Sequence, residues 1–432
     1  MNSKLFKQPS HAILLAAFFV LCLFLLWSSQ LLRLEPKAVG SKSFSVPQAR
    51  KGLYDVKSPF NGTWDFERDR KNYVLSSSQC DTVFPDLYAD LDRALNDRKG
   101  KKITLKELDG IKPKNGYVRG IIYDQQLYIV QTEGKIYSRG IATLLALNRA
   151  ITTSPEPLPK IEFTFSEDDW LPPTPQWALA RKSGDTATWL MPDYGYWSWP
   201  ETKVGSYGEV QDKALEMENS IDNPTGKAWP WSAKTPKVLW RGATMGLELR
   251  EKLLEITEGK PWADVKSLDW HNEQSMGADL KSMDQHCQYK YLVNTAGNSY
   301  SGRLKYIQNC RSVIIMHDMQ WFTHHTHLMK EAGTDQNYVK VERDFQDLER
   351  TVEGLRKDDA KAERIADNSA KIFRERYLTP AAEACYWRRL IRTWAAISFE
   401  PEFWEVKDGK RRWRGLPVES FVLEQRLEWD PY

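Results

Sequence analysis

Two arginines in this chain have the surroundings of a phosphate-binding residue. Arg303 follows the loop Thr295–Ser301, and Arg241 follows the short apolar run Lys237–Trp240 and precedes Gly242. A guanidinium beside a loop and a helix N-terminus suits a phosphate or diphosphate, because arginine forms paired hydrogen bonds with phosphate oxygens and the N-terminal N–H groups add partial positive charge. An ordinary strand–helix crossover with a surface arginine is the alternative, since no strict G-x-G-x-x-G or Walker pattern occurs.

A pair of carboxylates offers a second kind of chemistry. Asp168 and Asp169 come shortly after the alternating run Ile161–Phe165, which predicts a strand. Acidic groups at the carboxyl end of a strand lie where open α/β sheets bind ligands, and one carboxylate there could remove a proton from a substrate hydroxyl. The alternative is an Asx turn or a helix cap, which is the usual role of acids after a strand.

Each arginine is expected in a strand–loop–helix unit. Tyr289–Asn294 alternates like a strand, and Ser301 can cap the two-turn helix Gly302–Gln308 that follows. Ser312–Met316 is an apolar run typical of a buried parallel strand. Lys237–Thr257 predicts a second unit of the same kind. Two such units would place both guanidiniums at the same end of one sheet, which strengthens the case for an anion site.

Further elements frame these units. Gly116–Thr132 predicts a hairpin, Ser138–Ile151 predicts a helix capped by its first serine, and Pro380–Ile397 predicts a last long helix. The aromatic, proline-punctuated segment Trp189–Glu201 could face a sugar or act as a packed interdomain plug. The plug is the favoured interpretation.

The composition indicates a folded protein of two domains with appendages. The chain has 432 residues, which is long for a single core, and 41% of them are hydrophobic, including 18 Trp and 18 Tyr. A net charge of +3 is too small to argue for nucleic acid, and we find no dense basic patch with interleaved aromatics. We therefore expect no nucleic-acid partner.

The N-terminus predicts a membrane anchor. Ala12–Trp27 is an unbroken apolar run, which two further leucines extend to about the length that spans a bilayer. A cleaved signal peptide is the competing interpretation, but the run is longer than a usual h-region and no A-x-A-like site follows it. We expect a cytoplasmic tail and signal-anchor helix over residues 1–34 and a lumenal stem over 35–75, with Asn61 as a glycosylation site in an Asn-Gly-Thr sequon.

The cysteines fit an oxidising compartment. Cys22 lies in the apolar run, which leaves Cys80, Cys287, Cys310 and Cys385. Such a compartment favours pairing of an even set, while buried free thiols are the alternative. No C-x-x-C pair occurs, so zinc binding and thioredoxin chemistry get little support.

Five motifs occur in order along the chain. They are Trp229-Pro230-Trp231, Leu239-Trp240-Arg241-Gly242-Ala243-Thr244, His286-Cys287-Gln288-Tyr289-Lys290-Tyr291-Leu292, Gly302-Arg303-Leu304-Lys305-Tyr306 and Cys385-Tyr386-Trp387. Together they resemble glycosyltransferase family 90, the group that contains the fungal capsule-associated protein 10 domain and the animal protein O-glucosyltransferases. The resemblance covers roughly residues 110–395 and lies in the order and spacing of several motifs.

The resemblance implies an α/β fold of GT-B type, in which two Rossmann-like domains face a cleft. It places an acceptor-side domain over residues 76–222 and a nucleotide-sugar-binding domain over 223–379. Residues 380–432 would form a C-terminal helix that packs back on the first domain, followed by a tail. It also implies two disulfides, Cys287–Cys310 and Cys80–Cys385.

The resemblance also implies roles for the arginines. In the family, the arginine of the W/F-R-G motif and the arginine after the Gly/Ser loop hold the donor's diphosphate, and these correspond to Arg241 and Arg303. Gly242 and Ser301 belong to the same donor site. Ala243-Thr244 stands where the animal members carry Ser-Arg, which leaves the donor sugar open.

The family's general base corresponds to Asp169, and its neighbour Asp168 stays open as an alternative. The implied activity is transfer of glucose or xylose from UDP-glucose or UDP-xylose to a hydroxyl of a polysaccharide or glycoprotein, with inversion and without a metal. No cofactor is expected besides the UDP-sugar co-substrate. The expected location is the Golgi or ER membrane, as a single-pass type II protein. A non-catalytic lumenal glycan-binding or scaffold protein that retains the fold is the alternative.

Two patterns invite a metal interpretation that we do not favour. His324, His325 and His327 form a cluster, but no carboxylate or cysteine completes a convincing ligand set, so we interpret it as a solvated or acceptor-facing loop. Asp90 and Asp92 match the D-x-D of metal-dependent transferases only superficially. They lie in a predicted helix and are interpreted as surface charge.

Overall fold

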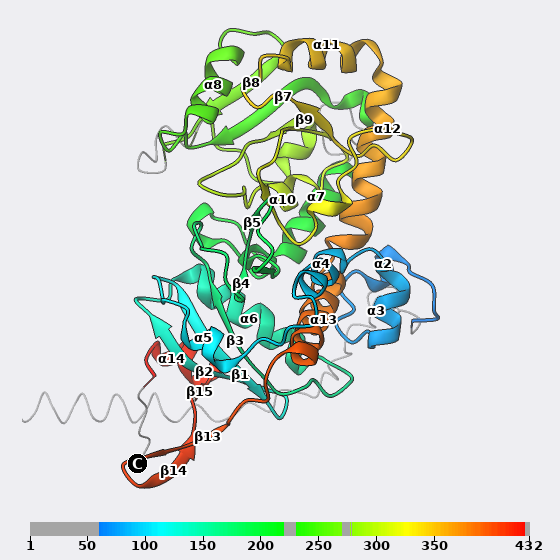
Figure 1. Ribbon diagram of the computed structural model, residues 1–432. Coiled ribbons are helices and arrows are strands. Elements are labelled where there is room, and N and C mark those ends of the chain that lie inside the picture. Colours follow the sequence, from blue (N-terminus) through cyan, green and yellow to red (C-terminus); the bar gives the residue numbers. More distant parts are fainter. Residues whose placement is uncertain (1–59, 220–229, 270–276, 278, 428–432) are drawn as a thin grey trace, which may run out of the picture. The chain divides into compact units, whose positions relative to one another are not determined.

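The structure is a computed structural model with a mixed α/β fold, and it describes residues 60–219, 230–269, 277 and 279–427 (Figure 1). All of these residues belong to one unit that begins at Phe60. The predicted membrane anchor, with Cys22, lies outside the described residues, as does Trp229 of the first motif. Within the described ranges, no helix is both long enough and apolar enough to cross a membrane.

The first sheet is mixed. Its strands are β1 (Tyr117–Tyr123), β2 (Gln126–Glu133), β3 (Ile161–Ser166), β4 (Trp177–Ala178), β6 (Trp189–Leu190) and β15 (Leu416–Pro417), in the order β15-β2-β1-β3-β4-β6. The predicted hairpin is confirmed, because β1 and β2 are antiparallel and joined by Asp124 and Gln125, whose φ angles of 48° and 62° fit a two-residue turn. β1 also runs antiparallel to β3, whereas β3, β4 and β6 are parallel. The sheet thus differs from the parallel sheet of a Rossmann-like domain, since so tight a turn can join only antiparallel strands.

The second sheet is wholly parallel. Its strands are β7 (Thr235–Gly242), β8 (Ala263–Ser267), β9 (Tyr289–Asn294), β10 (Val313–His317) and β12 (Val339–Val341), in the order β12-β10-β9-β7-β8. Every side chain of β9 and β10 is buried, as expected for central strands covered on both faces.

Both predicted strand–loop–helix units are present in this sheet. β9 has the predicted bounds and leads through α10 (Leu304–Ile307) to β10, while α8 (Glu248–Thr257) follows β7. The capping prediction for Ser301 is wrong, because Arg303 is the residue before α10 and no side chain caps it. A helix of four residues has little dipole, so anion binding in this loop depends on side chains.

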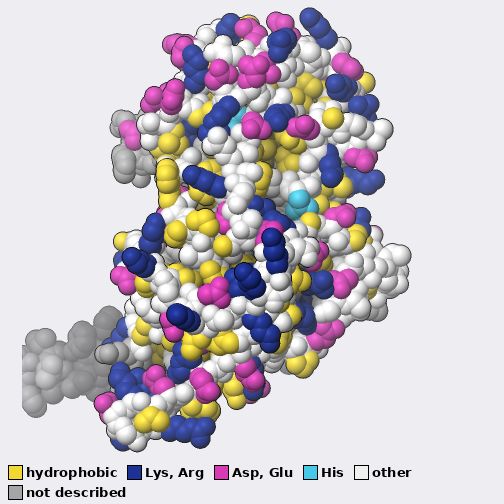
Figure 2. All heavy atoms as spheres, viewed as in Figure 1, with side chains coloured by type: hydrophobic (Ala, Val, Ile, Leu, Met, Phe, Trp, Pro, Cys, Tyr) yellow, Lys and Arg dark blue, Asp and Glu magenta, His cyan; other side chains and the backbone are white. Residues whose placement is uncertain are grey.

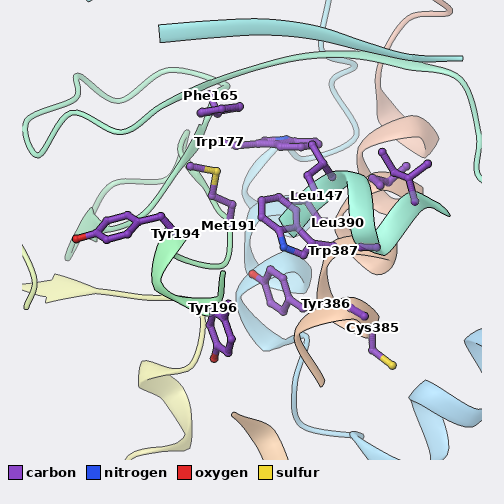
Figure 3. Packing of buried hydrophobic residues seen from close by; sticks show 14 of the residues in the cluster. Leu147, Phe165, Trp177, Met191, Tyr194, Tyr196, Cys385, Tyr386, Trp387 and Leu390 are labelled. Atoms are coloured by element: carbon purple, nitrogen blue, oxygen red, sulfur yellow. The ribbon is translucent and has the colours of Figure 1, made fainter. Parts of the chain in front are cut away.

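A large core joins the C-terminal helix to the first sheet. α6 (Ser138–Thr152) and α13 (Pro380–Ile397) pack together, and Figure 3 shows Tyr386, Trp387 and Leu390 of α13 beside Leu147 of α6 and Trp177 of β4. Trp177 also stacks on Phe163 at 4.1 Å between ring centroids and meets the edge of Trp394 at 5.7 Å. Ser138 begins α6 but does not cap it, because its hydroxyl donates to Glu201 instead.

Both disulfides that the resemblance implied are present. Cys80–Cys385 joins α3 (Ser77–Val83) to α13 across 305 residues of chain. Cys287–Cys310 joins two cysteines that are 23 positions apart and encloses β9 and the loop after it. In the chain-entropy model, such a cross-link stabilises the fold by restricting the unfolded chain, so the second one favours this loop's native conformation.

The C-terminal tail, which sequence patterns left unplaced, is structured over its described residues, up to residue 427. It forms the hairpin of β13 (Trp404–Lys407) and β14 (Lys410–Trp413), the edge strand β15 and the helix α14 (Val418–Glu424). The remaining elements are α2 (Phe66–Asp69), α4 (Ala89–Asp97), α5 (Leu105–Asp109), β5 (Arg181–Lys182), α7 (Tyr207–Asn219), β11 (Trp321–Phe322), α11 (Leu348–Lys357), α12 (Asp359–Ser369), a π-helix at Ala370–Tyr377 and several short 3-10 turns.

Candidate active site

A cavity of about 750 Å³ lies between the half of the described unit that contains the first sheet and the half that contains the parallel sheet. This volume falls in the range of small-molecule and cofactor sites. The charged and aromatic side chains that line it include Arg139, Asp169, Tyr194, Trp199 and Glu201 from the first half and Arg241, Arg250, His286 and Arg303 from the second. Asp168 is not among the lining residues.

Arg303 presents an unused hydrogen-bond donor next to this cavity. Its guanidinium lies 5.2 Å from the centroid of the Trp240 ring, and Nη2 donates to the carbonyl of Arg241 at 2.5 Å. Nη1 is buried and has no hydrogen-bond partner among the described residues. Burial and then the nearby Arg250 lower the pKa of Arg303 to about 9. A buried cation with an unfilled donor is the arrangement that an anionic ligand completes.

Gly242 makes this arrangement possible. A Cβ at this position would lie 2.5 Å from Nη2 of Arg303, which is closer than side-chain carbons come to other atoms. Any larger residue would displace the guanidinium from the Arg241 carbonyl. Ser301 is buried and lies on the wall of the same cavity.

Arg241 lines the cavity too, but protein acceptors occupy its guanidinium. Nε donates to the carbonyl of Asp279 at 2.7 Å, and Nη2 donates to Oδ1 of Asp264 at 2.5 Å. Nη1 donates to the carbonyls of Trp240 and Asp264. Burial by itself raises the pKa of Asp264, but hydrogen bonds from Tyr289 and Arg241 outweigh it and hold that pKa below its ordinary value.

Arg250, in the first turn of α8, was missed by the sequence patterns. It is 7% exposed, donates through Nε to the carbonyl of Ala296 and through Nη1 to the carbonyl of Ala243, and lies 6.0 Å from the Trp240 ring. None of the described carboxylates forms an ion pair with it. Burial lowers its pKa. Its spacing of nine residues from Arg241, at the same sheet edge, is the signal that could have drawn attention to it.

The two candidate carboxylates differ in their surroundings. Asp169 lines the cavity, and its Oδ1 accepts a hydrogen bond of 2.7 Å from the hydroxyl of Ser299, a residue of the loop after β9. Asp168 forms the Asx turn that was the alternative for this pair, because its Oδ1 accepts from the backbone N–H of Trp170 at 2.8 Å. Its other oxygen lies 3.7 Å from Nζ of Lys114.

Glu167 and Arg139 were also missed, because neither stands in a recognisable motif. Burial raises the pKa of Glu167 to about 7, and one of its carboxyl oxygens is buried without a hydrogen-bond partner. The Arg139 guanidinium lies 5.1 Å over the Tyr194 ring and 5.7 Å over the Trp199 ring, on the wall that carries Asp169. In the segment Trp189–Glu201, Trp189 is fully buried as a packed residue, while Tyr194 and Trp199 line the cavity. The sugar-facing role stays a prediction.

The solvated-loop interpretation of the histidine cluster is wrong. His324 and His325 are 2% and 4% exposed, because the turn packs under Tyr386 and Phe373, with centroids at 4.9 Å from His324 and 6.2 Å from His325. Burial, followed by the charge of His327, lowers the pKa of His325 to about 3. Across the described residues, no group of three or more His, Cys, Asp or Glu side chains could hold a metal ion.

The interpretation of Asp90 as surface charge is also wrong. Asp90 is 7% exposed and forms ion pairs with Arg93 at 3.0 Å and with Arg181 at 2.8 Å. Arg181 lies 91 residues away in the sequence, so helix spacing could not reveal this pairing. Asp92 is exposed.

Comparison with known proteins agrees with the motifs. Residues 76–405 match the model of glycosyl transferase family 90. Protein O-glucosyltransferase 2 of Danio rerio is 26% identical over 305 residues, which cover 67% of this chain and 57% of the relative. The O-glucosyltransferase rumi homolog of Aedes aegypti is 24% identical over 261 residues, covering 56% of this chain and 62% of the relative. Protein O-glucosyltransferase 1 of Homo sapiens is 22% identical over 259 residues, covering 54% and 62%.

The matched segments thus span less than two thirds of these relatives' own length. The family model, in contrast, covers most of the chain, including the parallel sheet, the first sheet without its edge strand β15, and the residues that line the cavity. The resemblance seen in the motifs is confirmed, and the chain belongs to glycosyl transferase family 90.

Proposed function

We propose that this chain transfers glucose or xylose from a UDP-sugar to a hydroxyl group of a polysaccharide or glycoprotein, with inversion and without a metal. The observation that carries the proposal is the cavity with arginines on one wall and Asp169 on the other. The O-glucosyltransferase names of the relatives favour glucose as the sugar. We further propose that the two halves correspond to the two domains of a GT-B architecture, with the donor bound by the half that contains the parallel sheet.

Arg303 and Arg250 are the proposed ligands of the donor's diphosphate. Nη1 of Arg303 has no protein partner and Arg250 pairs with no described carboxylate, so phosphate oxygens would supply the acceptors that the protein does not. When the bond between the anomeric carbon and the phosphate oxygen breaks, UDP leaves with the bonding electrons. The guanidiniums would then stabilise the added negative charge in a site that is already organised for it. Arg241 would act mainly by holding Asp264 and, through its carbonyl, Arg303.

Asp169 is the proposed general base. The hydroxyl of Ser299 holds one of its oxygens and so orients the carboxylate. None of the described cations forms an ion pair with it, although Arg139 lies on the same wall. The acceptor hydroxyl would pass its proton to Asp169 while its oxygen bonds to the anomeric carbon from the side opposite UDP, which inverts the configuration. The Asx turn of Asp168 fixes the backbone next to this carboxylate.

We also propose that the protein is a single-pass type II membrane protein of the Golgi or ER with its catalytic part in the lumen. The two disulfides support an oxidising compartment. Asn61 is exposed, as a glycosylation acceptor must be, and its side-chain oxygen accepts hydrogen bonds from Thr63 of the same sequon.

The test is UDP release by the detergent-purified full chain with a panel of nucleotide sugars and with sugar and peptide acceptors. We expect release with UDP-glucose or UDP-xylose, and no loss of activity after EDTA treatment. Release that requires a divalent metal would overturn the metal-independent mechanism. Glycan binding without nucleotide release from any donor would instead favour the non-catalytic alternative.

A further inference from the structure

The hairpin of β13 and β14 is an exposed surface that the family match does not explain. The match ends at residue 405, so most of the hairpin lies beyond it. Trp404, Val406 and Trp413 are 38%, 74% and 51% exposed. Figure 2 shows hydrophobic side chains beside Lys and Arg side chains at the lower left, where Figure 1 places this hairpin.

Strand pairing places Lys407 opposite the first residue of the basic run Lys410–Arg412. Lys407 and Lys410 are exposed and directly opposite each other across the hairpin, and Arg411 is opposite Val406. Like charges at directly opposite positions destabilise a strand pair. None of the described carboxylates forms an ion pair with these three cations, although Glu405 pairs with the neighbouring Arg412. Among the described residues, the hairpin therefore carries positive charge without an ion-pair partner, although the Arg411 guanidinium lies 4.4 Å from the centroid of the Trp404 ring.

The base of the hairpin is firmly attached to the first sheet. Phe403 stacks on Tyr123 with centroids 3.9 Å apart, and the Arg414 guanidinium pairs with the buried Glu162 at 2.8 Å. β15 then joins the edge of the sheet at β2. Because both ends of the hairpin are held, its exposed side chains keep their arrangement when a partner binds, and little conformational entropy is lost.

We propose that the β13–β14 hairpin binds an acidic glycan chain. Trp413 offers an exposed indole on which a sugar ring can stack, and Arg411 lies on the same face of the hairpin. Lys407 and Lys410 lie on the other face beside the tip, so a chain that passes over the narrow tip can pair its carboxylate or sulfate groups with all three cations. The proposal does not depend on the catalytic activity proposed above.

Two other classes of partner fit the hairpin less well. The tip, Asp408-Gly409, is charged and flanked by Lys407 and Lys410, and cations occupy both faces, so the hairpin has no apolar end to enter a bilayer. Nucleic acid also binds basic, aromatic surfaces, but the disulfides Cys80–Cys385 and Cys287–Cys310 indicate an oxidising compartment.

The test measures binding of the detergent-purified full chain to polygalacturonate and heparin, with neutral dextran as the comparison. The triple variant Lys407→Ala/Lys410→Ala/Arg411→Ala should lose about tenfold in affinity for both acidic polymers, which corresponds to about 1.4 kcal/mol. Trp413→Ala should weaken binding by roughly threefold even at high salt, because stacking is not screened. UDP release should not change in either variant.

The matched control is Arg350→Ala/Lys357→Ala/Lys361→Ala, which removes the same charge from exposed positions on α11 and α12. Equal loss of affinity in this control, or none in the hairpin variant, would overturn the proposal. So would tighter binding to single-stranded DNA than to either polymer. A preference for vesicles with anionic lipid over zwitterionic vesicles that only the hairpin variant removes, with polymer binding unchanged, would reassign the surface to membranes.

Discussion

The two walls of the cavity carry proposed reactive groups of opposite charge, although the wall with Asp169 also carries Arg139. On the wall from the parallel-sheet half, Arg250 and Arg303 donate only to neutral acceptors, and Nη1 of Arg303 has none. On the opposite wall, Asp169 is held by a neutral hydroxyl from Ser299. Neither wall neutralises its own charge with a partner of opposite sign at these positions.

This difference suggests a division of labour. Unpaired guanidiniums are suited to a leaving group that gains negative charge, and an unpaired carboxylate is suited to a group that loses a proton. Arg241 is the informative exception, because its ion pair with Asp264 gives it the features of a structural residue although it lines the same cavity. The expected effects below are ordered from largest to smallest.

Asp169→Asn tests the carboxylate wall and should have the largest effect. General-base catalysis typically contributes about 10²–10⁴-fold, so turnover measured as UDP release should fall by roughly a thousandfold. Asp168→Asn is the control and should lose about threefold or less, since an amide oxygen can still accept in the Asx turn. If Asp168→Asn instead lost the activity and Asp169→Asn kept it, the two roles would have to be exchanged.

Arg303→Ala tests the proposed diphosphate site on the wall with Arg250 and Arg303. A hydrogen bond to a charged group contributes about 1.5–3 kcal/mol, so the KM for the UDP-sugar should rise roughly 10- to 100-fold. Steady-state kinetics with the donor varied checks this. Thermal unfolding of Arg303→Ala and Arg241→Ala distinguishes the ligand-binding role of Arg303 from the structural role of Arg241. Arg241→Ala should lower Tm because it leaves Asp264 without its cation, whereas Arg303→Ala should not. An unchanged KM in Arg303→Ala would contradict the anion site.

Arg250→Ala should weaken donor binding less than Arg303→Ala does, because two N–H groups of Arg250 already donate to backbone carbonyls. We expect UDP affinity to fall about fivefold to tenfold in equilibrium titration. Lys252→Ala, on the same helix and paired only with Glu255, is the matched control and should bind UDP normally. If both variants lost UDP affinity equally, the loss would reflect the removal of any positive charge on this helix and not the position of Arg250.

Glu167→Gln should change stability in a pH-dependent way. The folded-state pKa of Glu167 is raised to about 7 by burial, so its contribution to stability is present at low pH and is lost as pH rises through about 7. The variant should therefore match the wild type near pH 4, below the ordinary pKa of a glutamate, and be more stable by roughly 1–3 kcal/mol at pH 8, since one pKa unit is worth about 1.4 kcal/mol. Chemical denaturation at the two pH values measures this, and a difference that does not change with pH would contradict it.

Much of the scaffold could be predicted because it depends on short-range patterns. β9 has the predicted bounds, and the β1–β2 hairpin formed as expected, since alternation and turn residues are local. The burial of His324, His325 and Asp90 could not be predicted, because their partners Tyr386, Phe373 and Arg181 are distant in sequence.

The candidate site was predictable only in part for the same reason. Spacing pointed to Arg241 and Arg303. It could not show that Arg241 donates to Asp264, or that Nη1 of Arg303 has no acceptor among the described residues. Arg250 occupies a position in a helix turn where an arginine is ordinarily solvated, so only tertiary contacts reveal it. The contact between Ser299 and Asp169 spans 130 residues and has no sequence signal at all.

The central claim is that the two walls act separately, one on the donor and one on the acceptor. Calorimetric titration of UDP into Asp169→Asn and Arg303→Ala, side by side with the wild type, tests it most directly. We expect Asp169→Asn to bind UDP within about twofold of the wild type while its UDP release falls by roughly a thousandfold, and Arg303→Ala to bind UDP at least about tenfold more weakly. An Asp169→Asn protein that loses UDP affinity as severely as Arg303→Ala would contradict the division of labour.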